Sequence, residues 1–207
     1  MTLKRKGQVY DRFAGAYDRQ MRPLERWGLA RLRARALAEA ATTLTEGGRL
    51  LEVGAGTGGN FAFYPKGARA ACVEPSREMI VRAAGKAERP EGSLLVRSFA
   101  EALPFADGAF DAGLATLVFC SVESPALGLG ELRRVVRAGG RVVLLEHVRP
   151  AGALGYAFDA LSLVTVALIE DHFNRRTADE ARRAGLEVLK VENYLRGVVQ
   201  LIVCRVV

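Results

Sequence analysis

The chain has 207 residues, of which 50% are hydrophobic and 26% are charged. This composition excludes a disordered chain, and the length suits one α/β domain over residues 1–207 with a buried core. The formal net charge of +7 makes a nucleic acid or an anionic membrane a partner to consider.

The positive charge is confined to the N-terminal segment. Residues 1–35 contain ten of the 30 basic side chains and three of the 23 acidic ones, so they carry the whole excess. A helix is expected over residues 23–44, where small and apolar side chains share one face. They are Trp27, Ala30, Ala34, Leu37, Ala38 and Ala41. Because this face is mostly alanine, the pattern favours a helix packed on a sheet over a helix lying in a membrane.

From residue 48 onward, short β-branched runs alternate with helical stretches. The expected strands are 49–53, 70–73, 94–97, 111–119 and 141–146, and the expected helices are 58–64, 76–87 and 124–137. Ser76 is expected to cap its helix, and Gly139 with Gly140 to end the third helix. Strands and helices that alternate at this spacing predict a doubly wound, mostly parallel sheet.

The C-terminal part predicts a helix over 177–184 and two strands over 186–194 and 198–206. Their three-residue link permits only antiparallel pairing, so we expect a seven-stranded α/β sheet with an antiparallel last strand. The preceding apolar stretch 153–169 favours an apolar, lipid-like substrate. Its longest apolar run has nine residues, whereas a membrane span needs about 20. We therefore expect a cytoplasmic protein and leave peripheral membrane contact open.

A glycine-rich loop follows the first strand, with Gly54, Gly56 and Gly59 in dinucleotide-type spacing. Glu74 lies about 20 residues further on, where an acid would accept from ribose hydroxyls. NAD-type dinucleotides and S-adenosylmethionine therefore compete, and a plain tight turn is the third reading. Glu52 would repel phosphates but can serve the ammonium or sulfonium of S-adenosylmethionine, and no second domain for a hydride acceptor is evident.

The motifs resemble those of class I S-adenosylmethionine-dependent methyltransferases, in the branch of the ubiquinone and menaquinone C-methyltransferases. The resemblance rests on LLEVGAGTG at 50–58 and on the segments 10–14, 17–18, 72–76, 100–111 and 132–140. The segments 117–122, 145–148 and 174–177 are similar to membrane-associated thiol methyltransferases. The resemblance implies a Rossmann-like core over 48–207 and a helical lid or cap over 1–47.

The resemblance also implies S-adenosylmethionine as cofactor, with S-adenosylhomocysteine as product. The residues expected to bind it are Glu52, Gly54, Ala55, Gly56, Gly58, Asn60, Glu74, Pro75, Met79, Phe99, Ala100, Glu101 and Thr116. Phe99 departs from the family pattern, because relatives usually carry an acid there for the adenine amino group. The adenine amino group would then need another acceptor.

Methyl transfer is an in-line displacement that mainly requires alignment, with a base only where the acceptor must lose a proton. His147 and His172 are candidate bases, the latter with Asp171 as a carboxylate that could hold it, and Tyr17 is a candidate lid residue over the cofactor. Structural roles for the two histidines remain open. The three cysteines are far apart, so no disulfide framework or metal site is expected.

The favoured function is methyl transfer to a small apolar or lipid-like acceptor, namely a phospholipid amine, a quinol or a thiol. The alternatives are an NAD(P)-dependent oxidoreductase, a nucleic-acid methyltransferase and a cofactor-binding protein without catalysis. No base-flipping tetrapeptide or RNA-binding module favours a specific nucleic acid. The basic lid is expected to meet anionic lipid head groups through four arginines. They are Arg22, Arg26, Arg31 and Arg33.

Overall fold

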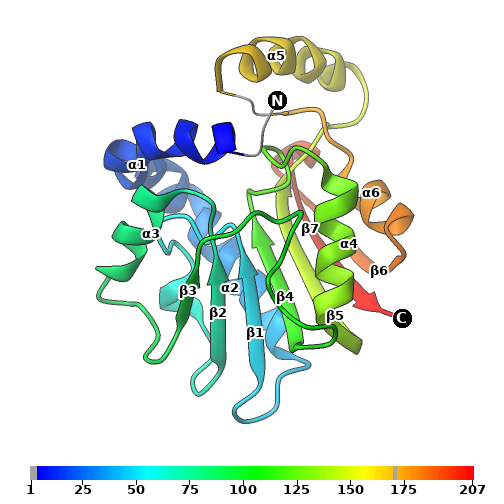
Figure 1. The fold of residues 1–207 in the computed structure, drawn as a ribbon. Helices are drawn as coiled ribbons and strands as arrows, with labels where there is room; N and C mark the ends of the chain where they lie inside the picture. Colours follow the sequence, from blue (N-terminus) through cyan, green and yellow to red (C-terminus); the bar gives the residue numbers. More distant parts are fainter. Residues whose placement is uncertain (1–3, 170–171) are drawn as a thin grey trace.

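The computed structural model describes residues 4–169 and 172–207, which form a seven-stranded sheet with helices on both faces (Figure 1). The strand order is β3-β2-β1-β4-β5-β7-β6. The strands are β1 Arg49–Val53, β2 Arg69–Val73, β3 Leu94–Val96, β4 Phe110–Thr116, β5 Val136–His147, β6 Leu186–Tyr194 and β7 Val199–Val206. Strands β1 to β5 pair in parallel, which confirms the doubly wound fold.

The last strand is antiparallel, as predicted, but it does not form the edge of the sheet. Strand β7 pairs with β5 on one side and with β6 on the other. Six of its eight residues are buried, whereas β6 has one buried residue of nine. The more apolar strand therefore takes the inner position, where both of its faces are covered.

The helices occupy both faces of the sheet and the carboxyl ends of its strands (Figure 1). They are α1 Lys4–Leu24, α2 Ala30–Ala41, α3 Arg77–Ala84, α4 Pro125–Val135, α5 Ala153–Ile169 and α6 Thr177–Arg183. A π-helical turn, Glu25–Leu29, joins α1 to α2. Helix α4 covers one face and α2 the other, while α1 and α5 lie over the carboxyl ends (Figure 1).

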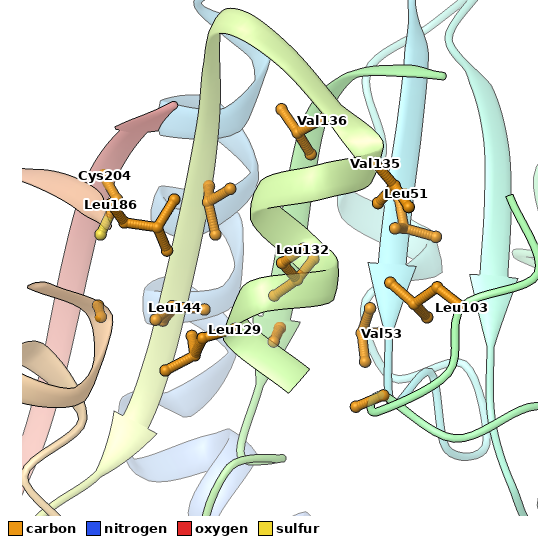
Figure 2. Packing of buried hydrophobic residues seen from close by; sticks show 14 of the residues in the cluster. Leu51, Val53, Leu103, Leu129, Leu132, Val135, Val136, Leu144, Leu186 and Cys204 are labelled. Atoms are coloured by element: carbon orange, nitrogen blue, oxygen red, sulfur yellow. The ribbon is translucent and has the colours of Figure 1, made fainter. Parts of the chain in front are cut away.

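The alternation of side chains along the strands divides the core into two layers. On one face, Leu129 and Leu132 of α4 pack against Leu51 and Leu144 (Figure 2). On the other face, Leu37 of α2 packs in a cluster with the buried residues Leu50, Leu114, Val143 and Leu201. Helix α2 is thus part of the core, and only the helical turns before it lie over the strand ends.

Three predicted elements are corrected by the structure. Residues 58–60 form turns, and Phe61–Phe63 form a short 3-10 helix. These replace the single helix predicted over 58–64. Strand β4 ends at Thr116 because Leu117 adopts a φ of 56°. Helix α4 ends at Val135, and the predicted glycine cap at 139–140 lies in a bulge of β5 opposite β4. The Ser76 cap is confirmed, since its side chain accepts from the amide of Met79.

The predicted apolar face of the N-terminal helix is wrong at most positions: the buried side chains of α2 are Arg33, Ala36, Leu37 and Ala40, and the predicted Ala38 is exposed. Gly28 has a φ of 131°, which interrupts the helix and rotates the residues after it relative to those before it. Trp27 is therefore 84% exposed, while Arg33 is only 6% exposed and faces the interior. Leu37 keeps its predicted place in the core. A regular helical period cannot be extended through a glycine with positive φ.

Candidate functional site

A cavity of about 1160 Å³ lies at the carboxyl ends of the strands, where open α/β sheets bind ligands. Nine of the thirteen residues predicted to bind the cofactor line it. They are Gly54, Gly56, Glu74, Pro75, Met79, Phe99, Ala100, Glu101 and Thr116. The other four are not among its lining residues in the described part of the chain. They are Glu52, Ala55, Gly58 and Asn60.

The glycine loop is held tightly at the end of β1. The amides of Gly54 and Ala55 donate to the carbonyl oxygen of Val73 at 2.8 and 3.0 Å. Gly54 has a φ of 70°, and a Cβ on it would stand 2.3 Å from Cγ2 of Val118. Both the backbone angle and the close approach of Val118 require glycine at this position.

Glu74 directly follows β2 and lines the cavity. One oxygen accepts from the amide of Gly56 at 3.0 Å, and the other from the amide of Ser76 at 2.9 Å. The pKa of Glu74 is raised to about 7, mainly by burial and also by the charges of Glu52 and Asp11, while these two hydrogen bonds lower it. A carboxylate in this place can accept hydrogen bonds from vicinal hydroxyls of a ribose.

Glu52 lies beneath the loop in a buried polar network. Its oxygens accept from Nδ2 of Asn60 at 2.7 Å and from the hydroxyl of Tyr64. Oδ1 of Asn60 accepts from Arg33 at 2.9 Å, and Arg33 also binds Glu25 at 2.9 Å. Burial raises the pKa of Glu52 despite these partners. Glu52 and Asn60 therefore lie beneath the loop and support it, and their predicted role toward a ligand stays a prediction.

Helix α1 is fastened to two loops that border the cavity. Asp11 accepts from the hydroxyl of Ser76 at 2.5 Å and from the amide of Glu78 at 3.1 Å. Asp18 accepts from the hydroxyl of Thr57 at 2.5 Å and lies 3.4 Å from Nζ of Lys86. The sequence pointed to Tyr17 of this helix and gave no role to these two acids. The signal was present, since two Tyr-Asp pairs seven residues apart fall on one helical face.

The three catalytic candidates have different surroundings. His147 lines the cavity and stacks on Phe173 with ring centroids 4.3 Å apart. Tyr17 also lines it, and burial raises the pKa of its hydroxyl to about 12, so it can donate a hydrogen bond at neutral pH. His172 is not among the lining residues of the described chain, and its amide donates to the carbonyl of Cys120 at 2.9 Å. Asp171, its predicted partner, lies outside the described residues.

The cavity extends from the β2 and β3 side of the sheet to the β7 side, beyond the predicted cofactor residues. This second end is mainly apolar. Its walls include Met21, Leu24, Leu29, Leu32, Val198 and Val199. Two charged residues that line the cavity, Arg31 and Arg35, are close in sequence to Leu29 and Leu32 of this wall. The acids of the lining, Glu74, Glu101 and Glu123, belong to the loops after β2, β3 and β4.

The described residues contain neither a candidate membrane span nor a candidate metal site. Within 4–169 and 172–207, no helix has the length and apolar character that crossing a membrane requires. In the same part of the chain, no group of three His, Cys, Asp or Glu side chains is arranged to hold a metal ion.

Comparison with known proteins gives a consistent result. A family model described as a methyltransferase domain matches residues 51–144. The chain is 33% identical over 150 residues to thiol S-methyltransferase TMT1B of Mus musculus, which covers 69% of this chain and 62% of that protein. It is 35% identical over 127 residues to phosphatidylethanolamine N-methyltransferase of Cereibacter sphaeroides, covering 59% and 63%.

A third relative is the ubiquinone/menaquinone biosynthesis C-methyltransferase UbiE of Syntrophotalea carbinolica, 33% identical over 156 residues, which covers 70% of this chain and 62% of that protein. The chain thus spans about three fifths of the length of these relatives. Among solved structures, a SAM-dependent methyltransferase of Thermotoga maritima aligns with a TM-score of 0.68 and 25% identity, over 97% of this chain and 99% of that one.

Proposed function

The chain belongs to the class I S-adenosylmethionine-dependent methyltransferases, and on that basis we propose that it transfers a methyl group to a small apolar acceptor. The observation that carries the proposal is one continuous cavity with two unlike ends. One end is lined by the glycine loop and Glu74, and the other by apolar side chains. Residues 1–207 would act as a single domain, with α1 as the lid.

The cofactor supplies a methyl group on a sulfonium, and the chain has to bind it and align the acceptor. In the proposal, Gly54 and Gly56 lie against the methionine part and Glu74 accepts from the ribose hydroxyls. Phe99 packs on the adenine ring in place of the acid that relatives usually carry. Tyr17 closes over the cofactor as a hydrogen-bond donor, which its raised pKa supports.

His147 would take the proton of an acceptor that has to lose one. Support comes from its place in the cavity and from the stacked Phe173, which fixes the plane of the imidazole ring. Arg31, near the apolar wall, favours an acceptor that is neutral or anionic when it reacts, whereas Arg35 is ion-paired with Glu192 at 2.7 Å. A thiol or a quinol fits this description better than a protonated amine does.

The test is incubation of the protein with methyl-labelled S-adenosylmethionine and three acceptor pools: small thiols, quinols and a membrane lipid extract. We expect label in the thiol or quinol pool, and less with His147→Gln, which should still bind S-adenosylhomocysteine. Glu187→Gln is the control, because Glu187 is a half-exposed residue of β6 that pairs with Arg205 and does not line the cavity. Label in none of the pools would overturn the proposed function, as would calorimetric binding of NADH without binding of S-adenosylhomocysteine.

We also propose that the rim of the cavity contacts an anionic lipid surface. Four exposed apolar side chains line the rim: Phe13, Leu24, Trp27 and Leu195. Three exposed arginines stand in the same helical segment: Arg22, Arg26 and Arg31. Arg33 is removed from the predicted set, because it is buried and bound to Asn60. Apolar side chains among basic ones are the chemistry of interfacial binding.

Liposome sedimentation tests this contact with vesicles of phosphatidylcholine alone or mixed with phosphatidylglycerol. Changing Arg22, Arg26 and Arg31 to Gln should weaken binding to the mixed vesicles and leave the affinity for S-adenosylhomocysteine intact. The control changes three exposed arginines that do not line the cavity: Arg69, Arg133 and Arg183. Equal binding by both triple variants would refute the contact.

A further inference from the structure

Glu146 is a buried carboxylate for which the proposed mechanism has no role. It is the penultimate residue of β5 and is 0% exposed, whereas the next residue, His147, lines the cavity. Successive side chains of a strand point to opposite faces, so the two have different surroundings. Within the described chain, Glu146 is not among the lining residues, and a base that contacts the acceptor does not fit its position.

The carboxylate of Glu146 binds the backbone of the neighbouring segment after β4. Its Oε1 accepts from the amides of Val118 and Phe119 at 3.0 and 3.1 Å, and its Oε2 lies 3.2 Å from the amide of Val118. Strands β4 and β5 are adjacent, so the segment after β4 leaves the sheet beside the end of β5 (Figure 1). Hydrogen bonds from two consecutive amides to one buried oxygen hold the backbone of this segment in place.

The backbone held in this way is strained. Leu117 adopts a φ of 56°, a left-handed conformation that a branched apolar residue rarely takes. Such a conformation persists only where the surrounding structure enforces it. The amide of Leu117 remains bonded to the carbonyl of Leu145 at 2.8 Å, and the carboxylate fixes the two amides after it. The chain is thereby turned out of the sheet and over its end.

The same segment forms a wall of the cavity. Residues 117–123, except the buried Phe119, all line it. Val118 lies against Gly54, and Phe119 is anchored in the core beside Gly128. The wall therefore joins the end that holds the glycine loop to the end with the apolar lining. A shift of this segment would change the relative placement of donor and acceptor, to which methyl transfer is sensitive.

We propose that Glu146 is a positioning residue that holds the segment 117–123 in its strained turn and so sets the wall between cofactor and acceptor. This inference rests on the proposed function of the cavity. In Glu146→Gln the amide nitrogen is a donor and would face backbone donors, so one of the present bonds is replaced by repulsion. The shorter carboxylate of Glu146→Asp keeps the charge but does not reach both amides equally.

The test compares Glu146→Gln with Asp111→Asn. Asp111 lies at the other end of β4 and accepts from the amide of Arg49 at 2.8 Å, so it is a matched carboxylate anchor away from the cavity. Hydrogen exchange of the Val118 and Phe119 amides should be at least tenfold faster in Glu146→Gln and unchanged in Asp111→Asn. The dissociation constant for S-adenosylhomocysteine should rise at least tenfold in the first variant and less than twofold in the second.

Each outcome decides the proposal. Unchanged exchange of the two amides in Glu146→Gln would overturn it, as would faster exchange with unchanged affinity. If Glu146→Gln does not fold, the same measurements are made on Glu146→Asp. The proposal is then supported if the two amides exchange faster than in the wild type and more slowly than free amides. A wild-type protein that binds no S-adenosylhomocysteine would overturn the proposed function, and the exchange rates would still show whether Glu146 holds the segment.

Discussion

The affinity for S-adenosylhomocysteine should depend on pH through Glu74. This carboxylate is 7% exposed, and its pKa is raised to about 7, mainly by burial and also by the charges of Glu52 and Asp11. Ribose hydroxyls would donate to its ionised form, so the complex keeps Glu74 ionised. Below pH 7 the free protein is protonated at Glu74 and must release that proton before it binds the ligand.

With a pKa of about 7, the ionised fraction of Glu74 falls from about 0.9 at pH 8 to about 0.1 at pH 6. The dissociation constant should therefore rise about tenfold, which corresponds to ~1.4 kcal/mol. Stability responds with the opposite sign. The pKa of Glu74 in the folded protein lies above its ordinary value of 4.5. The contribution of this carboxyl to stability is therefore fully present below pH 4.5 and is lost as the pH rises through about 7.

Calorimetric titration with S-adenosylhomocysteine at pH 6, 7 and 8 measures the effect. Glu74→Gln should bind more weakly and show no such pH dependence, whereas Glu187→Gln should keep the tenfold change. Equal dissociation constants of the wild-type protein at pH 6 and pH 8 would refute the reasoning, since they would mean that no ionised Glu74 is needed in the complex.

Three further changes test other parts of the site. Gly54→Ala should raise the dissociation constant for S-adenosylhomocysteine at least tenfold in calorimetry, because its Cβ would stand 2.3 Å from Val118. Asp11→Asn should speed the release of this ligand about tenfold in stopped-flow fluorescence. The substitution weakens a charge-assisted hydrogen bond to Ser76 that is worth about 1.5–3 kcal/mol. An unchanged release rate would argue against α1 as a lid. Arg33→Met should lower the free energy of unfolding in urea by about 3 kcal/mol, because buried polar partners lose their cation; wild-type stability would contradict this.

The fold and the end of the cavity lined by the glycine loop were largely predictable from sequence. The parallel strands, the glycine loop and the Ser76 cap depend on a few consecutive residues, whose periodicity and turn chemistry are visible in the chain. The same local order placed Glu74 at the end of β2, beside the loop that starts with Gly54. Its contact with the cavity followed from strand direction, because the carboxyl ends of parallel strands meet at one edge.

The sequence did not show the contacts that depend on packing between distant segments. Glu52 and Asn60 lie beneath the loop in a network that includes Arg33, which comes from another layer of the fold. The face of the N-terminal helix was predicted from a regular period that Gly28 interrupts. Neither outcome has a local signal, because both depend on how α2 docks on the sheet.

The sequence by itself determined which elements form, the order in which they alternate and the loop that suits S-adenosylmethionine. These properties follow from backbone preferences and hydrophobic periods that act over a few residues. Only the tertiary structure decided that β7 lies inside the sheet, that Arg33 is buried and that Glu146 holds the segment after β4. Those features arise from contacts across 27 or more residues, where burial and hydrogen bonding select among partners that no local pattern distinguishes.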